Sequence, residues 1–355
     1  MPVESLMSVC PDVQAELTQF YQSCDASMLR EPMPFFDFLW SDINVGNLQQ
    51  TVVPSAGKVK NVVLRYDQRI LESEVSEVNS CGTTCSSETK RGDLTHSVTI
   101  DPCDKLQISE VMSASDFVLS CQSNEFAVGR KIQMMIDALV RKMATRLTTQ
   151  AGTLLGNWDT STGISAGNPL CITTYNGGVI NPTAMADIDF ALMQTNFCNT
   201  TAIFAGSDIY KYSRAIQAGC CSTQGIDVSQ IVAQYGKAVL YDKRVASIVG
   251  QYGAWALQAG ALVPIYYVNN NANVFEAAGM AVGAGSPMVG ANYYKAVIQD
   301  PQSGLPIDLT ISDNCGNVSI VLEANAKLVS LPTDLFNEDD TMSGVNFFAP
   351  ISSDC

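Results

Sequence analysis

A single stretch of the sequence, from Ser123 to Leu155, constrains the fold more than any other part of the chain. Its apolar residues recur every three or four positions, which is the period of one face of an α-helix. That face consists of Ile132, Met135, Ile136, Leu139, Met143, Leu147, Ala151 and Leu154. The stretch therefore predicts one amphipathic helix, which Ser123 or Asn124 can cap and Gly156 can end.

The length of this predicted helix limits the kinds of protein to which the chain can belong. A helix of about thirty residues is about 45 Å long and has roughly three times the usual number of residues. The side opposite its apolar face is basic and carries Arg130, Lys131, Arg141, Lys142 and Arg146. Two interpretations follow: a long core helix of an ordinary α/β enzyme, or an exposed rod that other copies of the chain must cover.

The composition favours a protein with large protein contacts and disfavours one that coats nucleic acid. Only 15% of the 355 residues are charged, and uncharged polar or small residues suit protein–protein interfaces better than Lys and Glu do. An ordinary soluble surface is the alternative. The formal net charge is −15, whereas a protein wrapped on nucleic acid is basic. The charge remains compatible with a container whose wall must not adhere to the DNA inside.

The cysteines and the first residues predict a reduced, cytosolic protein. The twelve cysteines stand in no framework spacing, and MPVESLMSVC has neither the basic nor the apolar segment of a signal peptide. We therefore expect buried free thiols. Cys81, Cys85 and Cys103 do not have the spacing of a zinc site. Residues 245–275 carry no charge, but Pro264, glycines and asparagines interrupt them, which predicts buried sheet and turns and no membrane helix.

The first half of the chain divides into an arm, a hairpin and a helical segment. Residues 1–56 form the N-terminal arm, whose aromatic cluster PMPFFDFLW is either a small core or a plug for a neighbouring subunit. Residues 57–105 predict an extended β-hairpin, because two alternating runs flank a polar tip. Such a hairpin is marginal by itself, so we expect a neighbouring subunit to support it. Residues 106–164 contain the predicted helix 123–155.

The second half predicts a compact α/β unit followed by a small sheet. Residues 165–295 contain a buried strand, TAIFAG, and a helix that Ser207 caps and Gly219 ends. Residues 296–335 are predicted to return to the first part as strands, with PQSG and DNCG as turns and NVSIVLEA and AKLVSLP as separate strands. Residues 336–355 are expected to form a loose C-terminal tail.

Residue types that carry catalysis are scarce. His96 is the one histidine of the chain, and Asp101 is too far along its strand to pair with it, so we interpret His96 as structural. The run GAGSPMVG lacks the lysine and the helix start of a phosphate-binding loop. Asp187 and Asp189 lie near a helix start, where they favour the helix dipole. We therefore predict no catalytic, cofactor-binding or metal-binding residues, no cofactor, and a protein that is not an enzyme.

The order of these parts resembles the major capsid protein of tailed double-stranded DNA bacteriophages, with the Hong Kong 97-type capsid fold. The arm, the hairpin, the very long helix, the α/β unit and the returning strands carry the likeness. Two local runs are similar as well: SDIYKYSRAI after TAIFAG, and GLPIDL with DNCGN. The resemblance implies an α+β fold in which 123–155 is the spine helix, 57–105 the extended loop, 106–164 with 296–335 the peripheral domain, and 165–295 the α/β axial domain.

The resemblance also implies a function and partners. The subunit would assemble with itself into hexamers and pentamers of an icosahedral shell that encloses double-stranded DNA without sequence-specific binding. Expected partners are a portal, decoration or auxiliary capsid proteins, and a separate scaffolding protein, because only 56 residues precede the hairpin. The location would be the virion, after assembly in the host cytoplasm. Although Lys58, Lys60 and Lys90 lie in or near the loop, we expect no covalent crosslink to a neighbour.

Three other functions stay open. An encapsulin-like nanocompartment shell would have the same fold and a different cargo. A cytosolic cysteine-dependent α/β enzyme is conceivable with twelve cysteines, although a single histidine argues against it. A tail or baseplate component would form tubes or rings. If the chain is a shell subunit, the basic helix face is expected to pair with acids of a neighbouring copy, such as Glu72, Glu74 and Glu77.

Overall fold

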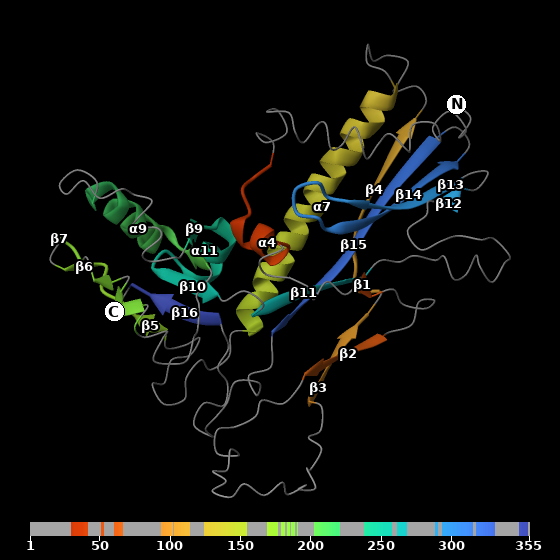
Figure 1. Ribbon diagram of the computed structural model, residues 1–355. Coiled ribbons are helices and arrows are strands. Elements are labelled where there is room, and N and C mark those ends of the chain that lie inside the picture. The colour runs from red at the N-terminus through yellow and green to blue at the C-terminus, as the bar shows by residue number, and fades with distance from the viewer. Residues whose placement is uncertain are drawn as a thin grey trace, which may run out of the picture. The chain divides into compact units, whose positions relative to one another are not determined.

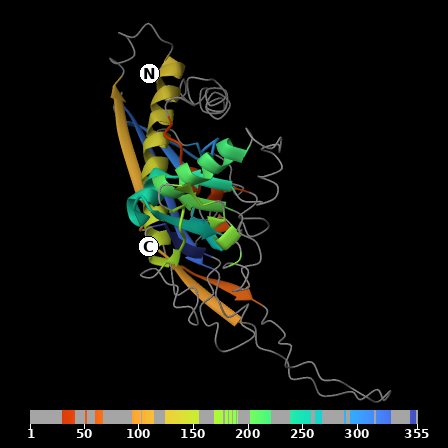
Figure 2. The same ribbon diagram turned by 90° about the vertical axis from the view of Figure 1, so that its left-hand side faces the viewer.

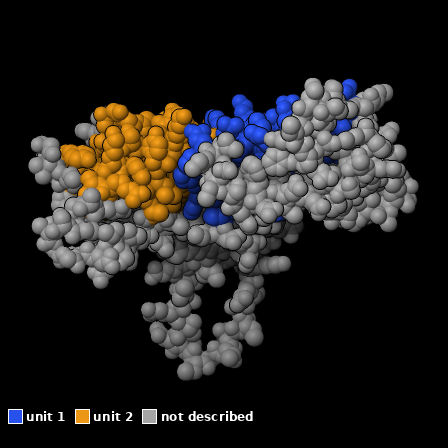
Figure 3. Space-filling model, turned by 90° about the horizontal axis from the view of Figure 1, so that it is seen from above, with its two compact units in different colours: residues 1–60, 99–151, 263–328 blue, residues 61–98, 152–262, 329–355 orange. Residues whose placement is uncertain are grey.

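The structure is a computed structural model with two compact units, which Figure 3 colours separately. Unit 1 comprises the described residues within 1–60, 99–151 and 263–328, and unit 2 those within 61–98, 152–262 and 329–355. The described residues are 30–41, 51–52, 60–66, 94–101, 103–113, 124–154, 169–176, 179–181, 183–184, 186–188, 190, 202–220, 238–257, 261–267, 288–289, 293–314, 317–330 and 348–353.

Unit 1 is built on a seven-stranded sheet. The strand order is β1 (Thr51–Val52), β11 (Leu262–Tyr267), β15 (Asn317–Ser330), β14 (Pro306–Asn314), β13 (Tyr293–Gln299) and β12 (Met288–Val289), and β4 (Leu106–Ser113) also pairs with β15. The β13–β14–β15 meander is antiparallel, as the turn residues predict. Its cross-strand neighbours Ile311 and Ile320 are both buried. The sheet therefore offers one apolar layer of the core.

The long helix predicted over 123–155 is confirmed as α7 (Asn124–Leu154). Figures 1 and 2 show it running alongside β4 and β15. Every predicted member of its apolar face is buried, apart from Leu154, which is half-buried. The Leu328 backbone N–H donates a hydrogen bond of 3.1 Å to the Gln150 side chain and so ties the helix to β15. Burial of this face stabilises unit 1, because it removes a long apolar stripe from water.

The aromatic cluster of the arm belongs to the core of unit 1. It forms α4 (Pro34–Leu39), with a proline in the first turn, where the fixed φ of proline suits a helix start. Phe35, Phe36 and Leu39 are at most 1% exposed. The ring centroids of Trp40 and Tyr266 lie 5.7 Å apart. The structure thus decides between the two predicted roles: the cluster is core, and it is not a plug for a neighbouring subunit.

Unit 2 contains a mixed five-stranded sheet with the order β5 (Leu170–Cys171), β16 (Phe348–Ser352), β10 (Gly253–Leu257), β8 (Ala202–Ala205) and β9 (Ala238–Tyr241). Its helices are α9 (Ser207–Cys220) and α11 (Lys243–Val249), and β6 (Tyr175–Asn176) pairs with β7 (Val179–Ile180). The core combines strand and helix residues: Ile172, Ala184, Ile188, Ile203, Ala205, Ile209, Tyr212, Ala254, Ala256, Ala261 and Ile351. The predicted buried strand TAIFAG is confirmed as β8.

The passage from β8 into α9 requires a glycine. The Gly206 N–H donates to the Gly253 carbonyl at 2.8 Å, and a Cβ on Gly206 would lie 2.4 Å from the Gly250 carbonyl oxygen. No side chain fits at that distance. The helix differs from the prediction at both ends, because Ser207 is its first residue and it continues through Gly219 to Cys220.

The predicted hairpin has its two strands in place. β2 (Lys60–Tyr66) and β3 (Leu94–Ile100) form a two-stranded sheet, as the alternating runs of the sequence indicate. The polar tip between them lies outside the described residues. That 57–105 extends over a neighbouring subunit stays a prediction.

The structure corrects the prediction of a loose tail over 336–355. Residues Phe348–Ser352 form β16, which pairs with β10 on one side and β5 on the other. Ile351 is 1% exposed. The segment is short and contains Pro350, so no alternation reveals a strand. Pairing within the sheet outweighs its weak intrinsic preference.

Two further boundaries are wrong. NVSIVLEA and AKLVSLP do not form separate strands, because residues 317–330 are the single strand β15. Asn325, which lies between the two runs, makes no turn: it is buried, and its side chain donates a hydrogen bond of 2.9 Å to the Asp101 carbonyl. The α/β unit predicted over 165–295 ends too late, because the described strands β11, β12 and β13 pair within the sheet of unit 1. β4 is a strand that the sequence patterns did not predict.

Candidate assembly surfaces and a buried charge cluster

The outward side of α7 presents three exposed cations, Arg130, Arg141 and Lys142, which we name the α7 cation strip. Helical spacing places them within about 120° of one another round the axis. The structure shows no ion pair from these three to any described acid. The other predicted basic residues are paired within the chain. Lys131 Nζ lies 3.1 Å from Glu110 Oε2 on β4, and Arg146 pairs with Asp104.

β4 is an edge strand among the described residues, where its one partner is β15. Exposed and half-buried residues alternate along most of it, and Val111 is 63% exposed. An unpaired strand edge offers backbone N–H and C=O groups to a strand from another chain. Met134 on α7 adds a second exposed apolar side chain to unit 1, at 58%. These features make β4 and the outward side of α7 a candidate contact surface.

A second candidate surface lies on unit 2, around the edge strand β9. The ring centroids of Tyr210 on α9 and Tyr241 on β9 are 5.9 Å apart. The guanidinium carbon of Arg214 lies 5.3 Å from the centre of the Tyr210 ring, and Tyr241 is 42% exposed. Tyrosine and arginine dominate the binding energy of many protein interfaces. The arrangement suits a contact with another protein surface.

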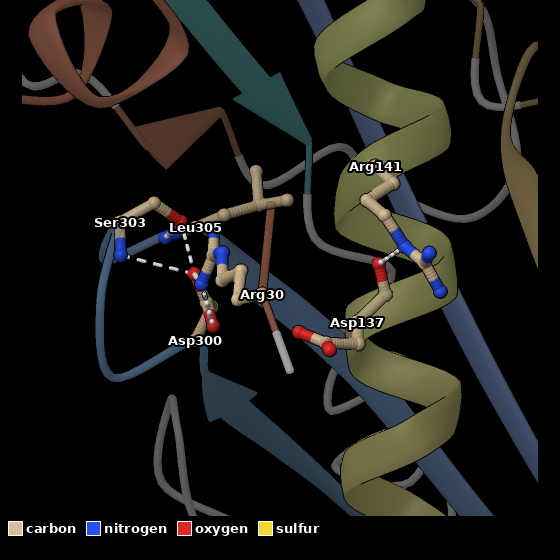
Figure 4. Close-up of polar contacts among 6 residues, drawn as sticks. All are labelled: Arg30, Asp137, Arg141, Asp300, Ser303 and Leu305. Atoms are coloured by element: carbon tan, nitrogen blue, oxygen red, sulfur yellow. Dashed lines mark hydrogen bonds and ion pairs between the residues drawn. The ribbon is translucent and has the colours of Figure 1, made fainter. Parts of the chain in front are cut away.

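A buried ion pair fastens the segment before α4 to the turn between β13 and β14 (Figure 4). Arg30 Nη1 donates to both carboxylate oxygens of Asp300, at 3.0 and 2.9 Å, and the two side chains are 3% and 0% exposed. The Ser303 backbone N–H donates to Asp300 Oδ2 at 2.9 Å, and the Ser303 hydroxyl bonds to the same atom. These bonds offset the cost of burying the carboxylate.

Arg30 lies between Asp300 and a second carboxyl group, that of Asp137 on α7 (Figure 4). Burial raises the pKa of Asp137, while Arg30 and then Arg141 act to lower it. Asp137 Oδ1 and Arg30 Nη2 are both buried and make no hydrogen bond. The cluster therefore contains one satisfied ion pair and two facing groups whose hydrogen bonds are unfilled.

The residues that the sequence singled out for chemistry do not come together in the described structure. His96 lies on β3, with its side chain outside the described atoms, and Cys81, Cys85 and Asp189 lie outside the described residues. Asp187 is exposed and accepts a hydrogen bond from the Thr183 hydroxyl at 3.3 Å. In the described part of the chain, no group of three or more His, Cys, Asp or Glu side chains is placed to hold a metal ion.

The expectation of buried free thiols is wrong at two described cysteines. Cys103 is free but exposed, because it lies in the polar turn that leads into β4. Cys171 takes part in a disulfide bond. None of the helices in the described part of the chain is long and apolar enough to cross a lipid bilayer.

The sequence patterns missed the Arg30–Asp300 pair, whose members are 270 positions apart. One signal was present, since Arg30 is the only Lys or Arg before Lys58. A lone cation in a long acidic and apolar segment is a candidate for a specific ion pair. Its partner could not be read from the sequence, because pairing at such a separation depends on the tertiary fold.

The protein resembles known proteins in its structure but not in its sequence. No protein-family model matches the sequence, and no curated protein matches it either. A chain of the cyanophage A-1(L) capsid asymmetric unit aligns with 91% of this chain over 92% of its own length, with a TM-score of 0.52 and 12% sequence identity. The protein has the fold of a phage capsid structure. At this identity the likeness establishes the fold alone.

Two other capsid structures match less closely. The capsid of cyanophage P-SCSP1u aligns over 91% of this chain and 88% of its own, with 10% identity and a TM-score of 0.41. The capsid of Myoviridae phage XM1 aligns over 87% and 91%, with 10% identity and a TM-score of 0.38. The fold is therefore assigned from the likeness to the cyanophage A-1(L) structure. The α+β class expected from the sequence is confirmed.

Proposed function

We propose that the protein is a major capsid protein, the self-assembling structural subunit of an icosahedral shell that encloses the double-stranded DNA of a tailed phage. The observation that carries the proposal is the fold shared over 91% of this chain and 92% of a capsid chain. A match that covers nearly all of both chains supports this role for the chain as a whole and not for one segment of it.

The finer proposal is a Hong Kong 97-type subunit. In it α7 is the spine helix, the strands of unit 1 belong to the peripheral domain, and unit 2 supplies the axial domain. The β2–β3 hairpin is the base of the extended loop. The long helix beside the sheet of unit 1 and the mixed sheet of unit 2 support this assignment. In this proposal the strands β11, β12 and β13, which pair within the sheet of unit 1, belong to the peripheral domain.

Assembly would proceed by burial of surface between copies, with no chemical step, catalytic residue or cofactor. Contacts that run head to tail and close on themselves give the hexamers and pentamers of a shell. The hairpin needs support because two strands alone are marginal, and the β4 edge is open to a further strand. The α7 cation strip would meet acids of a neighbouring copy, for which Glu72, Glu74 and Glu77 stay the predicted candidates.

The remaining partners follow from the shell function. A portal, a separate scaffolding protein and decoration or auxiliary proteins would bind the shell, and the net charge of −15 keeps most of the wall from adhering to the enclosed DNA. The protein would be found in the virion after assembly in the host cytoplasm.

Electron microscopy of the expressed full chain, alone and with a candidate scaffolding protein, tests the proposal. We expect closed icosahedral particles. Closed particles that enclose an enzyme and no nucleic acid would indicate an encapsulin-like nanocompartment. Tubes or rings would indicate a tail or baseplate component. A stable monomer under all conditions, with or without the scaffold, would overturn the proposal.

A further inference from the structure

The interior of unit 1 holds an incomplete hydrogen-bonding arrangement around Arg30. One nitrogen of its guanidinium group, Nη1, is saturated by the two oxygens of Asp300. The other, Nη2, is buried and makes no hydrogen bond, and neither does the buried Oδ1 of Asp137. Figure 4 shows the Asp137 carboxyl pointing from α7 toward Arg30. An unmet buried donor that faces an unmet buried acceptor is rare in proteins, because each costs free energy.

The open contact between Arg30 and Asp137 fits a neutral Asp137 carboxyl. A neutral carboxyl is a weaker partner for a guanidinium than a carboxylate is, because charge roughly doubles the strength of such bonds. The charged groups that act on Asp137 are Arg30 from the segment before α4, Arg141 from its own helix, and Asp300 from the turn after β13. Burial outweighs the two cations and raises the pKa of Asp137, so the neutral form persists to a higher pH than in an ordinary aspartate.

We propose that Arg30 and Asp137 form a pH-sensitive bridge between α7 and the segment that enters α4. When Asp137 is ionised, its Oδ1 accepts a hydrogen bond from Arg30 Nη2, while Nη1 keeps its bonds to Asp300. When Asp137 takes up a proton, the bridge to α7 opens and the pair with Asp300 remains. Arg30 is suited to this task because one guanidinium can bind two carboxylates at once.

The bridge would control how firmly the first part of the chain is held to unit 1. α4 begins four residues after Arg30, and its Asp37 N–H donates to the Met33 carbonyl at 2.9 Å. A contact between Arg30 and α7 restrains the segment that leads into this helix. The inference goes beyond the capsid function and does not depend on it, because every group involved belongs to one chain.

Hydrogen exchange of the α4 amides over a pH series tests the bridge. The full-length chain is used, and exchange rates are corrected for the intrinsic effect of pH. We expect the protection of the Asp37, Phe38 and Leu39 amides to rise about tenfold as Asp137 ionises, which is the effect of roughly one hydrogen bond to a charged group. The midpoint should lie above the ordinary aspartate value.

Two variants separate the bridge from a general effect of pH. Asp137→Asn cannot ionise, and Arg30→Lys keeps a charge for Asp300 but lacks the second nitrogen, so both should lose the pH-dependent rise. Asp104→Asn, which alters the exposed pair with Arg146, should keep it. A flat pH profile of α4 protection in the wild-type protein would overturn the proposal, and this measurement requires no variant. The same pH-dependent rise in Asp137→Asn would overturn the proposal as well. Neither result would affect the test of the shell by electron microscopy.

Discussion

The charged side chains of α7 differ in their surroundings, and these surroundings give them different roles. Toward the interior, Asp137 faces the buried pair of Arg30 and Asp300, in which both side chains are at most 3% exposed. Toward solvent, the α7 cation strip makes no ion pair with a described acid, although Arg141 lies one turn from Asp137 and acts on its pKa. Arg146 and Asp104 pair with 25% and 65% of their side chains exposed. Buried charges must be paired for the chain to fold. Exposed charges of the same helix contribute little to folding and remain available for a partner.

The largest expected effect comes from breaking the interior pair. Asp300→Ala leaves the Arg30 guanidinium buried without its carboxylate, and we expect the free energy of unfolding to fall by about 3–5 kcal/mol. Urea unfolding at neutral pH, followed by circular dichroism, measures the change. The matched control is Asp104→Ala in the exposed pair, for which a loss of about 1 kcal/mol or less is expected. Equal losses in the two variants would contradict the comparison.

Removal of a single supporting hydroxyl should have a smaller effect on the same cluster. Ser303→Ala deletes one hydrogen bond to the Asp300 carboxylate, and bonds to charged groups contribute about 1.5–3 kcal/mol. The control is Ser41→Ala, whose hydroxyl donates to the neutral Phe38 carbonyl at 2.7 Å and should contribute about 0.5–1.5 kcal/mol. If Ser303→Ala and Ser41→Ala lower the free energy of unfolding by the same amount, the charge of Asp300 does not govern the strength of the hydrogen bonds that it accepts.

These interior groups show where prediction from the sequence ends. The helix α7 and the identity of its buried and basic faces follow from periodicity, because burial on a helix repeats every three or four residues. The meander of β13, β14 and β15 follows from alternation and from turn residues. Arg30 and Asp300 have no such local signature, since they meet only when two distant segments fold together.

The same reasoning explains one error in the second unit and one choice in the first unit that the sequence left open. β16 contains a proline and only five residues, and it becomes a strand because β10 and β5 flank it. The aromatic cluster at Phe35 and Phe36 could serve a core or an interface equally well, since both bury apolar rings. Its place in unit 1 depends on β11, which lies more than two hundred positions later in the chain.

The pH dependence of the free energy of unfolding tests Asp137, which faces the interior pair. The expected effect is smaller, and its sign follows from the direction of the pKa shift. Burial raises the pKa of Asp137 in the folded chain, so the folded state holds this proton more tightly than the unfolded state does. The stability that Asp137 contributes is therefore fully present at low pH and falls as the pH rises from the ordinary aspartate value through the raised one. Asp137→Asn should lack this loss and be more stable than wild type at neutral pH.

Thermal unfolding of both proteins from pH 3 to pH 8 measures the difference between wild type and Asp137→Asn. The two curves should converge at the acid end and separate as the carboxyl ionises. A variant that is less stable than wild type at neutral pH would mean that attraction to Arg30 and Arg141 outweighs burial. That outcome would contradict the assignment of burial as the main cause of the pKa shift of Asp137.

The outward side of α7 should show the smallest effect on folding and a clear effect on assembly. Lys142→Glu places an acid where the structure shows an exposed cation of the strip. Surface substitutions of this kind usually change stability by less than about 0.5 kcal/mol. If acids of a neighbouring copy face the α7 cation strip, the reversed charge should lower the yield of assembled particles, and low salt should deepen the loss because repulsion is then less screened. The matched control is Lys211→Glu, an exposed cation on α9 of unit 2. Unchanged yield for Lys142→Glu at all salt concentrations would remove the cation strip from the assembly surface. Equal losses in both variants would point to the net charge of −15 as the factor that limits assembly.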